Sequence, residues 1–340
     1  MGTLSGPTPV SIVIVSYESA AYLPELLGAL AADTEGPAEV IVVDNASADD
    51  SAAIAEAAGG TVIRMSSNVG FSAGCHAGAD LASNDTVVFV NPDTVPRAGW
   101  LPPLVDALTL PSVGAACATL ELMDRPGHFN SSGGALTYYG VAWATDVGTP
   151  IPKELDPVET PFPSGAAMAI RVDTWRELGG YRPDFFMYHE DSDLGWRLRL
   201  RGLRSVRVPA SVVAHSYEFE RNEYKMFYLE RNRLMMLRTN YRGLTLALLA
   251  PVLGAVELGI LIIAIRDGWG GAKVRSWKGA WRARKATTAW RVSIVRTVTD
   301  GDILASMQSS PAGASQVRVP AARLVGWLLS GYLRFVRLFV

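Results

Sequence analysis

The sequence predicts an α/β fold in which helices flank a mostly parallel central sheet, followed by a helical extension at the C-terminus. Three apolar runs rich in β-branched residues, 11–16, 39–44 and 85–93, alternate with helix-like segments. Such runs are typical of strands buried on both faces, and strand–helix–strand alternation produces a parallel sheet. The extension is indicated by a change of charge after residue 240, since residues 241–340 hold 14 Lys and Arg against 4 Asp and Glu.

The length and charge of the chain favour two regions with different partners. The 340 residues suffice for a domain of roughly 200–250 residues plus an extension. The net charge of −2 divides into −12 for residues 1–240 and +10 for residues 241–340. Two cysteines, Cys75 and Cys117, are too few for a disulfide framework, which fits a reducing compartment, and no Cys/His cluster has zinc spacing.

Two predicted helices connect the first three strands. Residues 21–32 place four leucines at the spacing of one helix face. Residues 48–58 are rich in alanine, and Ser47 or Asp49 is expected to cap the N-terminus of this second helix.

Polar residues follow each of the three apolar runs. They are SYES after residues 11–16, DNAS from Asp44 and NPDT from Asn91. Asp and Asn are common in turns, but the ligands of parallel sheets bind at the carboxyl ends of the strands. Three polar ends in succession therefore predict a polar binding site at this edge of the sheet.

Residues 68–78, NVGFSAGCHAG, combine glycines with other small residues. Glycine-rich backbone at a helix start can cradle phosphates, although this segment matches neither the dinucleotide fingerprint nor the Walker A pattern. Close packing of a helix on the sheet is an equally good interpretation, and both stay open at this point.

The middle of the chain is less regular. Residues 110–160 contain many Gly, Pro and turn residues with weak periodicity, so irregular strands and loops are expected. A small-residue turn at 164–167 then precedes a strand and a short helix around 172–178, which should end at Gly179 and Gly180.

Three carboxylates, Glu190, Asp191 and Asp193, fall within four positions of the segment FFMYHEDSDLGWRLRLRG. If a helix begins here, Glu190, Asp193 and Arg197 share one face, and Asp191 points about 100° away. This predicts a structural ion pair between Asp193 and Arg197 and leaves Asp191 for another task. An acidic first turn that complements the helix dipole is the simpler alternative, but the aromatic residues just before the cluster favour a partly desolvated cleft.

These residue types suit transfer from a donor that carries a diphosphate leaving group. A divalent cation neutralises charge on a diphosphate and binds one or two carboxylates, a role for which Asp93 at the end of a buried run is suited. Removal of a proton from an acceptor hydroxyl needs a carboxylate base, which the cluster at 190–193 could supply.

The sequence resembles the family-2 glycosyltransferases, which have the GT-A (Rossmann-like) fold, and is especially similar to their bacterial rhamnosyltransferase branch acting on lipid-linked saccharides. Six motifs stand in the family's order over about 190 residues. They are VSY at 15–17, VVDNAS at 42–47, NVGFSAG at 68–74, NPDT at 91–94, SGAAMAIR at 164–171 and the segment 185–202.

The resemblance implies roles for individual residues. Those implied to contact the donor are Ser16, Tyr17, Asp44, Asn45, Ser47, Asn68, Gly70, Asp93 and Gly165. Asp93 would bind a divalent cation, Mg²⁺ or Mn²⁺, as the remaining carboxylate of an Asp-x-Asp motif that here reads Asn91-Pro92-Asp93. His215 matches a histidine that completes the metal site in relatives, while a purely structural histidine is the alternative.

The catalytic carboxylates are also implied by the resemblance. Asp191 matches the family's general base, and Glu190 is expected to shape the acceptor site. The family inverts the anomeric centre in one in-line displacement without a covalent intermediate. His76 departs from the family's pattern, because relatives usually have Asn at this position.

We therefore expect an inverting glycosyltransferase that moves rhamnose or a similar deoxysugar in cell-wall or surface polysaccharide synthesis. The expected donor is a nucleoside-diphosphate sugar, with dTDP-rhamnose favoured over a UDP-sugar, and the expected acceptor is a polyprenyl-diphosphate-linked saccharide. Two alternatives are kept: a sugar nucleotidyltransferase, whose Gly-rich loop with Arg and Lys near the first strand is missing from SIVIVSYES, and a non-catalytic carbohydrate-binding subunit.

The expected domains are a catalytic domain at 1–240, with a donor half at about 8–110 and an acceptor half at about 111–240, and a membrane-associating region at 241–340. In that region, the 22-residue run 244–265 holds a single charge, Glu257, and one proline, Pro251. These two residues argue for a broken or interfacial pair of helices rather than a spanning helix, though the length would suffice to span.

Basic and aromatic residues follow this apolar run. Residues 266–296 hold nine Lys and Arg interleaved with four tryptophans, and residues 325–340 are apolar with two arginines. This composition predicts contact with an anionic membrane surface, at the cytoplasmic face of the plasma membrane, rather than with nucleic acid. A helical bundle packed on the catalytic domain and a homo-oligomer contact are the alternatives.

Overall fold

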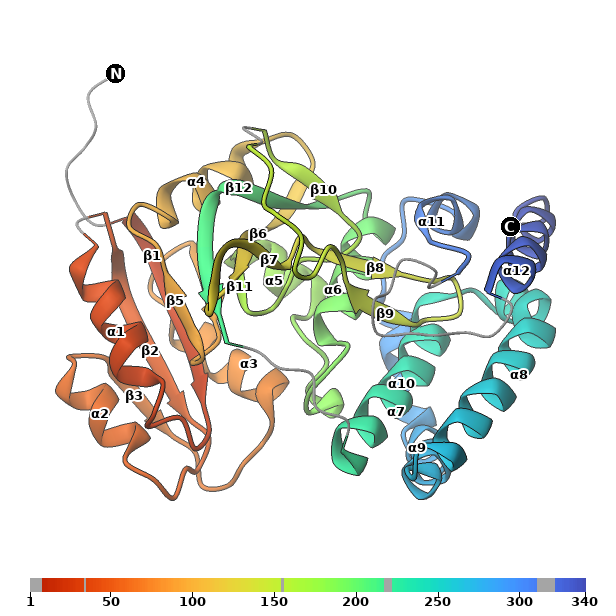
Figure 1. Ribbon diagram of the computed structural model, residues 1–340, viewed down its shortest axis with the longest axis horizontal. Helices are drawn as coiled ribbons and strands as arrows, with labels where there is room; N and C mark the ends of the chain where they lie inside the picture. The colour runs from red at the N-terminus through yellow and green to blue at the C-terminus, as the bar shows by residue number, and fades with distance from the viewer. Residues whose placement is uncertain (1–7, 34, 154–155, 217–221, 311–321) are drawn as a thin grey trace.

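The computed structural model describes residues 8–33, 35–153, 156–216, 222–310 and 322–340. Within these residues, ten strands form one sheet, and a group of helices from the C-terminal third of the chain lies beside it (Figure 1). The predicted α/β class with a helical C-terminal extension is confirmed.

Four parallel strands form the first half of the sheet, in the order β4-β1-β2-β3. They are β1 (Thr8–Ser16), β2 (Pro37–Asp44), β3 (Thr61–Arg64) and β4 (Thr86–Val90). The three predicted strands are therefore present and parallel. β3 was not predicted, because its four residues lie at the sheet edge and are at best half-buried.

The second half of the sheet continues from β4 in the order β11-β6-β12-β10. Its long strands are β6 (Val113–Leu122), β11 (Ala167–Arg171) and β12 (Arg204–His215). β11 is antiparallel to both neighbours, whereas β12 runs parallel to β6. Shorter strands are β5 (Thr94–Pro96), β7 (Arg125–Ser131) and β10 (Val158–Thr160), and a separate pair is formed by β8 (Gly134–Leu136) and β9 (Ala142–Ala144).

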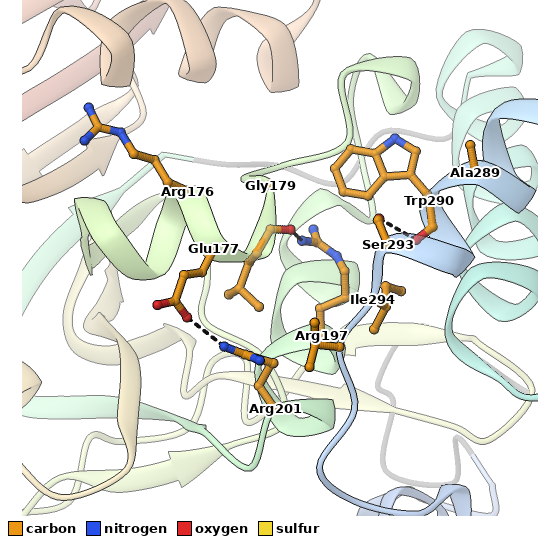
Figure 2. A pocket seen from close by; sticks show the side chains of 11 residues that line it. Arg176, Glu177, Gly179, Arg197, Arg201, Ala289, Trp290, Ser293 and Ile294 are labelled. Atoms are coloured by element: carbon orange, nitrogen blue, oxygen red, sulfur yellow. Dashed lines mark hydrogen bonds and ion pairs between the residues drawn. The ribbon is translucent and has the colours of Figure 1, made fainter.

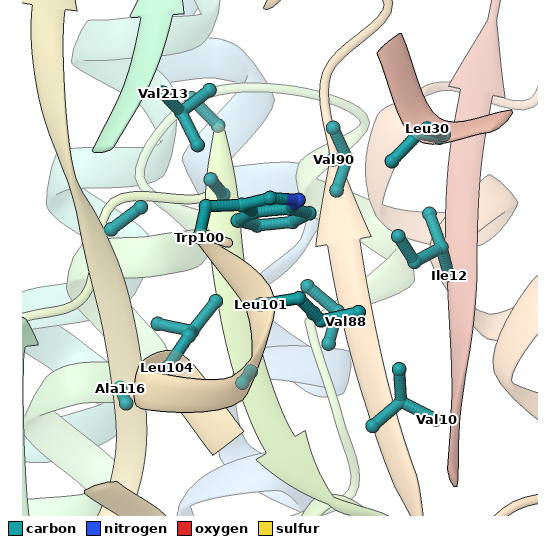
Figure 3. Close-up of a cluster of buried hydrophobic side chains, with 14 of the residues drawn as sticks. Val10, Ile12, Leu30, Val88, Val90, Trp100, Leu101, Leu104, Ala116 and Val213 are labelled. Atoms are coloured by element: carbon teal, nitrogen blue, oxygen red, sulfur yellow. The ribbon is translucent and has the colours of Figure 1, made fainter. Parts of the chain in front are cut away.

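Helices cover both faces of the sheet. One core lies between β1, which contributes Ile12 and Ile14, and the helices α1 (Leu23–Ala32), α2 (Ser51–Ala57) and α4 (Leu101–Asp106). Figure 3 shows part of it, with Leu101 and Leu104 of α4 near Ile12 and Leu30. The 3₁₀ turn η1 (Ala107–Thr109) follows α4. α3 (Phe71–Leu81), α5 (Val172–Leu178) and α6 (Glu190–Leu200) enclose the other core with Val13 and Val15, because successive strand side chains point to opposite faces.

Three local predictions, two about helix ends and one about the cysteines, can be compared with the structure. α5 ends at Gly179 in the left-handed conformation, as expected. The predicted N-cap of α2 was wrong: Asp50 holds that position, and Asp49 instead accepts the N–H of Ser51 from two residues away. Cys75 and Cys117 are both buried free thiols, so the expectation of no disulfide framework is confirmed.

The glycines inside α3 serve close packing on the sheet. A Cβ added at Gly74 would lie 2.7 Å from a methyl of Val15, and one at Gly78 would lie 2.2 Å from a methyl of Val13. For these two positions the packing interpretation of residues 68–78 is correct, whereas Gly70 has a different position at the start of the helix.

The prediction of irregular structure across 110–160 was wrong for β6. This ten-residue strand, VGAACATLEL, is buried along almost its whole length. Its side chains are small because α6 packs closely on it: a Cβ at Gly114 would lie 2.4 Å from a methyl of Leu198. Because Gly and Ala have low β-propensity, the small residues of β6 did not indicate a strand.

The C-terminal helices form a third core together with the second half of the sheet domain. They are α7 (Glu223–Asn240), α8 (Gly243–Arg266), α9 (Gly270–Arg282), α10 (Arg284–Ser293), α11 (Asp300–Ser306) and α12 (Ala322–Val336). The shared core includes Tyr138, Trp196, Met236 and Leu333. α7 lies against α9 and α10 as well as α6, so the division at residue 240 stays a prediction.

The expected break in the apolar run 244–265 does not occur. α8 is one continuous helix with Pro251 inside it. Proline has no N–H, so Pro251 cannot donate a hydrogen bond to the carbonyl oxygen of Ala247. Both residues lie on the exposed side of the helix. Glu257 turns inward, where it pairs with Arg233 and Lys273.

Candidate active site

The carboxyl ends of β1 and β2 lie side by side, with Ser16 opposite Asp44 in the parallel register. The N–H of Asn45 donates to the Ser16 carbonyl oxygen at 2.8 Å, which locks the two strand ends together. Ser16 is fully buried, and its Oγ has no hydrogen-bond partner among the described residues. Tyr17, by contrast, is 51% exposed, and Ser47 Oγ accepts the N–H of Glu18.

Asn45 connects these strand ends to the glycine-rich segment. Its Nδ2 donates to Asn68 Oδ1 at 3.0 Å, and its Oδ1 accepts the N–H of Val69 at 2.9 Å. Asn68 Oδ1 also accepts the N–H of Gly70, the N-cap of α3. Gly70 has a φ of 85°, and a Cβ there would lie 2.5 Å from the carbonyl oxygen of Phe186, so the glycine-rich segment touches the segment that leads to the carboxylates.

Asp93 and His215 meet at the far side of the same sheet edge. His215 Nε2 lies 3.5 Å from Asp93 Oδ1, and His215 Nδ1 lies 3.0 Å from Asn130 Oδ1. Because an amide oxygen can only accept, Nδ1 carries the hydrogen and Nε2 is the nitrogen that faces Asp93. Asn130 was missed by sequence reasoning, since nothing in the chain relates it to a histidine 85 residues later.

The turn at 164–167 joins Asp93's loop to the carboxylate helix. The N–H of Asn91 donates to the Ala166 carbonyl oxygen at 2.9 Å. A Cβ added at Gly165 would lie 3.9 Å from the Cβ of Asp191, so the glycine and the carboxylate are direct neighbours. His76 is placed elsewhere: its Nε2 lies 2.6 Å from the Tyr181 carbonyl oxygen, a contact that fastens α3 to the loop before α6.

The carboxylates at the start of α6 are divided as their spacing predicted. Asp193 is buried and pairs with Arg197 at 2.8 Å, and its other oxygen accepts from Asn240. Arg197 also donates to the Leu178 and Gly180 carbonyl oxygens, so the predicted structural ion pair is confirmed. Asp191 has a different environment and accepts from the N–H and hydroxyl of Ser192.

Burial changes the protonation of the other two carboxylates. The pKa of the Asp191 carboxyl rises to about 6 because it is desolvated, although the Ser192 and Gly165 N–H groups oppose this. Desolvation and the neighbouring charge of Asp191 raise the pKa of Glu190 to about 8. Glu190 Oε2 is buried and has no hydrogen-bond partner among the described residues. Both carboxyls therefore hold a proton to higher pH than exposed carboxyls do, because the site is buried and two neighbouring charges in it repel each other.

Two series of contacts therefore link most of the predicted site residues. The first passes from Ser16 and Asp44 through Asn45, Asn68 and Gly70 to Phe186. The second passes from Asp191 through Gly165 and Asn91 to Asp93 and His215. Across the described ranges, no group of three or more His, Cys, Asp or Glu gathers in a way that could hold a metal ion alone.

A pocket of about 440 Å³ lies away from these residues, between α5, α6 and α10 (Figure 2). Arg176, Arg197, Arg201 and Trp290 line it. Arg201 pairs with Glu177, and Arg197 is fully engaged by Asp193 and two carbonyl oxygens. Two of the three arginines at this pocket, Arg197 and Arg201, therefore bind partners within the protein, and Asp191 and Asp93 are not among the lining residues.

Comparison with known proteins identifies related sequences. The family model described as Glycosyl transferase family 2 matches residues 11–179. An N-acetylglucosaminyl-diphospho-decaprenol L-rhamnosyltransferase of Mycobacterium tuberculosis is 28% identical over 229 residues, which are 60% of this chain and 75% of the relative. Human polypeptide N-acetylgalactosaminyltransferase 10 is 27% identical over 149 residues, 41% of this chain and 25% of the relative.

Solved structures share the fold at lower identity. GalNAc-T7 with UDP, GalNAc and Mn²⁺ superposes with a TM-score of 0.57 at 17% identity, covering 68% of this chain and 47% of that one, about half its length. The mannosyltransferase PcManGT from Pyrobaculum calidifontis, in complex with GDP-Man and Mn²⁺, gives a TM-score of 0.50 at 17% identity and covers 97% of this chain and 86% of that one.

Proposed function

The chain carries a glycosyl transferase family 2 domain with the GT-A fold, and on this premise we propose that it is an inverting, metal-dependent sugar transferase acting at a membrane. The sugar is rhamnose or a similar deoxysugar, the donor a nucleoside-diphosphate sugar with dTDP-rhamnose favoured, and the acceptor a polyprenyl-diphosphate-linked saccharide. The product belongs to cell-wall or surface polysaccharide synthesis. The mycobacterial relative, a rhamnosyltransferase acting on a diphospho-decaprenol substrate, supports this choice.

The observation that carries the proposal is the place of Asp191. A carboxylate at the start of α6, held against Gly165 and charged near neutral pH, stands at the sheet edge where the donor-side residues also gather. Asp191 takes the proton of the acceptor hydroxyl as that oxygen attacks the anomeric carbon, and the nucleoside diphosphate leaves from the opposite face. Its raised pKa makes it a better base at physiological pH than an ordinary aspartate. Glu190, protonated and buried, shapes the acceptor side.

The donor lies over the ends of β1 and β2 in this proposal. Ser16, Tyr17, Asp44, Asn45 and Ser47 contact the base and ribose, and the unpartnered Oγ of Ser16 is one polar group that a ligand would satisfy. Asn68, Gly70 and Gly165 lie nearer the diphosphate.

Asp93 and His215 fit the requirements of a divalent cation, Mg²⁺ or Mn²⁺. A carboxylate oxygen and an imidazole nitrogen face each other 3.5 Å apart, and Asn130 orients the imidazole in the way that metal-binding histidines are usually oriented. A cation bound there supplies charge neutralisation for the leaving diphosphate. The two related structures named above contain Mn²⁺ with nucleotides or nucleotide sugar.

The membrane is the expected location because the acceptor is anchored in lipid. α8 is the one helix of the described residues that is long and apolar enough to cross a membrane, with a mean hydropathy of 2.5, and only 17% of its most apolar 18-residue window is buried. Its outward face is apolar, with Leu244, Leu258, Ile262 and Ile265 each more than half exposed. The inward ion pairs of Glu257 with α7 and α9 favour a helix lying on the surface over one that spans.

Two rival functions remain to be separated by experiment. A sugar nucleotidyltransferase would form a nucleotide sugar from a nucleoside triphosphate, and the family match favours transfer instead. A non-catalytic carbohydrate-binding subunit would bind a donor without turning it over.

The test uses purified protein. Thermal unfolding is followed with a panel of nucleoside diphosphates and nucleotide sugars with Mg²⁺ or Mn²⁺, and the best donor is then offered with a polyprenyl-diphospho-N-acetylglucosamine acceptor. We expect stabilisation by one nucleotide class and transfer with inverted anomeric configuration. Binding without transfer or donor hydrolysis would support the non-catalytic alternative, and diphosphate release from a nucleoside triphosphate and a sugar phosphate would support the nucleotidyltransferase.

A further inference from the structure

The backbone that leads into α6 holds three non-glycine residues at positive φ. Phe186 has φ 66° and ψ −61°, and Tyr188 and His189 both have φ 68°. The N–H of Met187 donates to the Phe185 carbonyl oxygen at 2.8 Å, which makes Phe186 the centre of a γ-turn of the rare, strained type. Such conformations persist only where the surrounding structure holds them, and they cluster at functional sites.

One side chain of α7 holds this turn through three carbonyl groups at once. The two N–H bonds of Asn232 Nδ2 are directed to three carbonyl oxygens, those of Phe185, Met187 and Tyr188, at 3.0, 2.8 and 2.8 Å, so one hydrogen is shared between two acceptors. Asn232 is fully buried, so these bonds face no competition from water.

The neighbouring Arg231 holds the residues just before. Its Nη2 donates to the Asp184 and Phe185 carbonyl oxygens at 2.7 and 2.8 Å, and its Nε donates to Asn232 Oδ1 at 2.9 Å. The last bond orients the Asn232 amide so that its N–H groups point to the turn. Arg231 and Asn232 thus act as one unit, which we name the α7 clamp.

The opposite side of the turn rests on the donor half of the site. The Phe186 carbonyl oxygen accepts the N–H of Ser72 at 3.2 Å and lies against Gly70, while the Phe186 ring stacks on Tyr228 of α7 with centroids 5.1 Å apart. α6 begins at Glu190, directly after the turn. The backbone position of Asp191 is therefore set by how the turn is held between α3 and α7.

We propose that Asn232, oriented by Arg231, is a positioning residue that holds the turn 185–189 and thereby places the Asp191 carboxylate for transfer. The proposal rests on the function of Asp191 as base. Asn232 touches neither the reacting atoms nor the cation site. Without its N–H groups, the carbonyl oxygens lose a shared donor and the γ-turn can relax, which moves Asp191 relative to the donor. A misplacement of about 1 Å can reduce a rate by about 10²-fold.

The first experiment compares Asn232→Ala with Met236→Ala, a matched control. Met236 is a fully buried core residue of the same helix, four positions away. It shares a hydrophobic core with Phe185, but its side chain cannot donate a hydrogen bond to the carbonyl oxygens of the turn. We expect Asn232→Ala to lower kcat of transfer about 10²-fold while the Kd for the nucleotide changes less than about threefold. We also expect the acid limb of the pH profile to move to lower pH as Asp191 gains water. Equal effects of the two variants at equal loss of thermal stability would overturn the proposal.

A double-mutant cycle separates this proposal from the function on which it rests. If Asn232 acts through Asp191, Asn232→Ala should cause little further loss of transfer in the Asp191→Asn background, whereas a general structural role would add its full effect. Near wild-type transfer by Asp191→Asn alone would refute the base assignment itself. Loss in Asp191→Asn together with an additive loss in the double variant would refute only the clamp.

Arg231→Gln keeps the test decisive should Asn232→Ala fail to fold. Arg231 is only half-buried, so this variant retains a soluble polar side chain while losing the donation to the turn. We expect it to reduce transfer at least tenfold with nucleotide binding kept. A folded Arg231→Gln protein with unchanged kcat and pH profile would contradict the clamp.

Discussion

At the scale of single residues, Asp191 and Glu190 are buried neighbours, and burial raises the pKa of both carboxyls. Asp191→Asn keeps the shape and removes the base, so transfer should fall by about 10²–10⁴-fold with little change in donor binding. In the wild type, transfer should rise as the pH increases through about 6, where burial places the pKa of Asp191. Steady-state kinetics between pH 5 and 8 check both statements, and transfer by the variant near the wild-type rate would remove Asp191 from the mechanism.

Glu190 should affect stability through its raised pKa. Since the pKa of about 8 in the folded protein exceeds the usual 4.5, the folded state keeps a proton that the unfolded chain has released. This contribution to stability is complete below pH 4.5 and is lost as the pH rises through 8. The glutamine of Glu190→Gln cannot ionise. The thermal midpoint of this variant, relative to that of the wild type, should therefore rise by several degrees between pH 5 and pH 9. A constant difference across this range would mean that Glu190 is not buried with a raised pKa.

Asp93 should matter for metal-dependent binding as well as for turnover. Asp93→Ala should weaken donor binding in the presence of Mg²⁺ or Mn²⁺ and leave the weak metal-free binding unchanged, because the cation bridges protein and diphosphate. Calorimetric titration with and without EDTA measures both values. Full wild-type activity after exhaustive chelation would count against a catalytic metal at Asp93 and His215.

At the scale of elements, the start of α3 shows how one glycine joins two segments. Gly70→Ala places a Cβ against Phe186 in addition to the cost of φ 85°. Gly59→Ala is the matched control, because Gly59 has φ 82° but nothing within 4 Å of the added Cβ. The control should lose about 1 kcal/mol of unfolding free energy. Gly70→Ala should lose more unfolding free energy than the control, and its rate of transfer should fall at least tenfold. Equal stability and activity of both variants would show that the contact with Phe186 is unimportant.

The same scale explains why α7 is central to this chain. Glu230 and Arg233 belong to a buried ion network with Glu257 of α8 and Lys273 of α9, while Arg231 and Asn232, between them in sequence, hold the turn before Asp191. One turn of helix thus touches both the segment proposed to be catalytic and the helices proposed to lie on the membrane. Lys273, counted by composition among the basic surface residues, is fully buried in this network and is unavailable to lipid.

At the scale of the whole molecule, basic and apolar side chains of the C-terminal helices should act together in membrane binding. A variant with five basic residues changed to Gln should bind anionic liposomes more weakly, since each basic residue near such a surface contributes about 1 kcal/mol. The residues are Arg275, Lys278, Arg282, Arg284 and Lys285. Arg275 should count least, because it pairs with Glu223. Transfer to a lipid acceptor should slow more than hydrolysis of the soluble donor.

Solution conditions distinguish the two modes of membrane contact. A protein that lies on the surface should be released by high salt or alkaline carbonate, whereas a spanning α8 would resist both. Unchanged liposome binding by the five-residue variant, or equal loss of both activities, would assign these residues to folding or assembly instead.

The sequence by itself determined the parallel strands β1, β2 and β4, the polar residues at their ends, the start of α6 and the Asp193–Arg197 pair. Each depends on a local pattern: an apolar run, a turn residue, or a spacing of four within one helix. Only the tertiary structure decided that β6 is a long strand, that Asn130 orients His215, that Glu257 turns inward from an unbroken α8, and that Asn232 holds the γ-turn before Asp191. These features depend on atoms that packing brings together from distant positions, for example 24, 45 and 85 residues apart, and no local periodicity records such contacts.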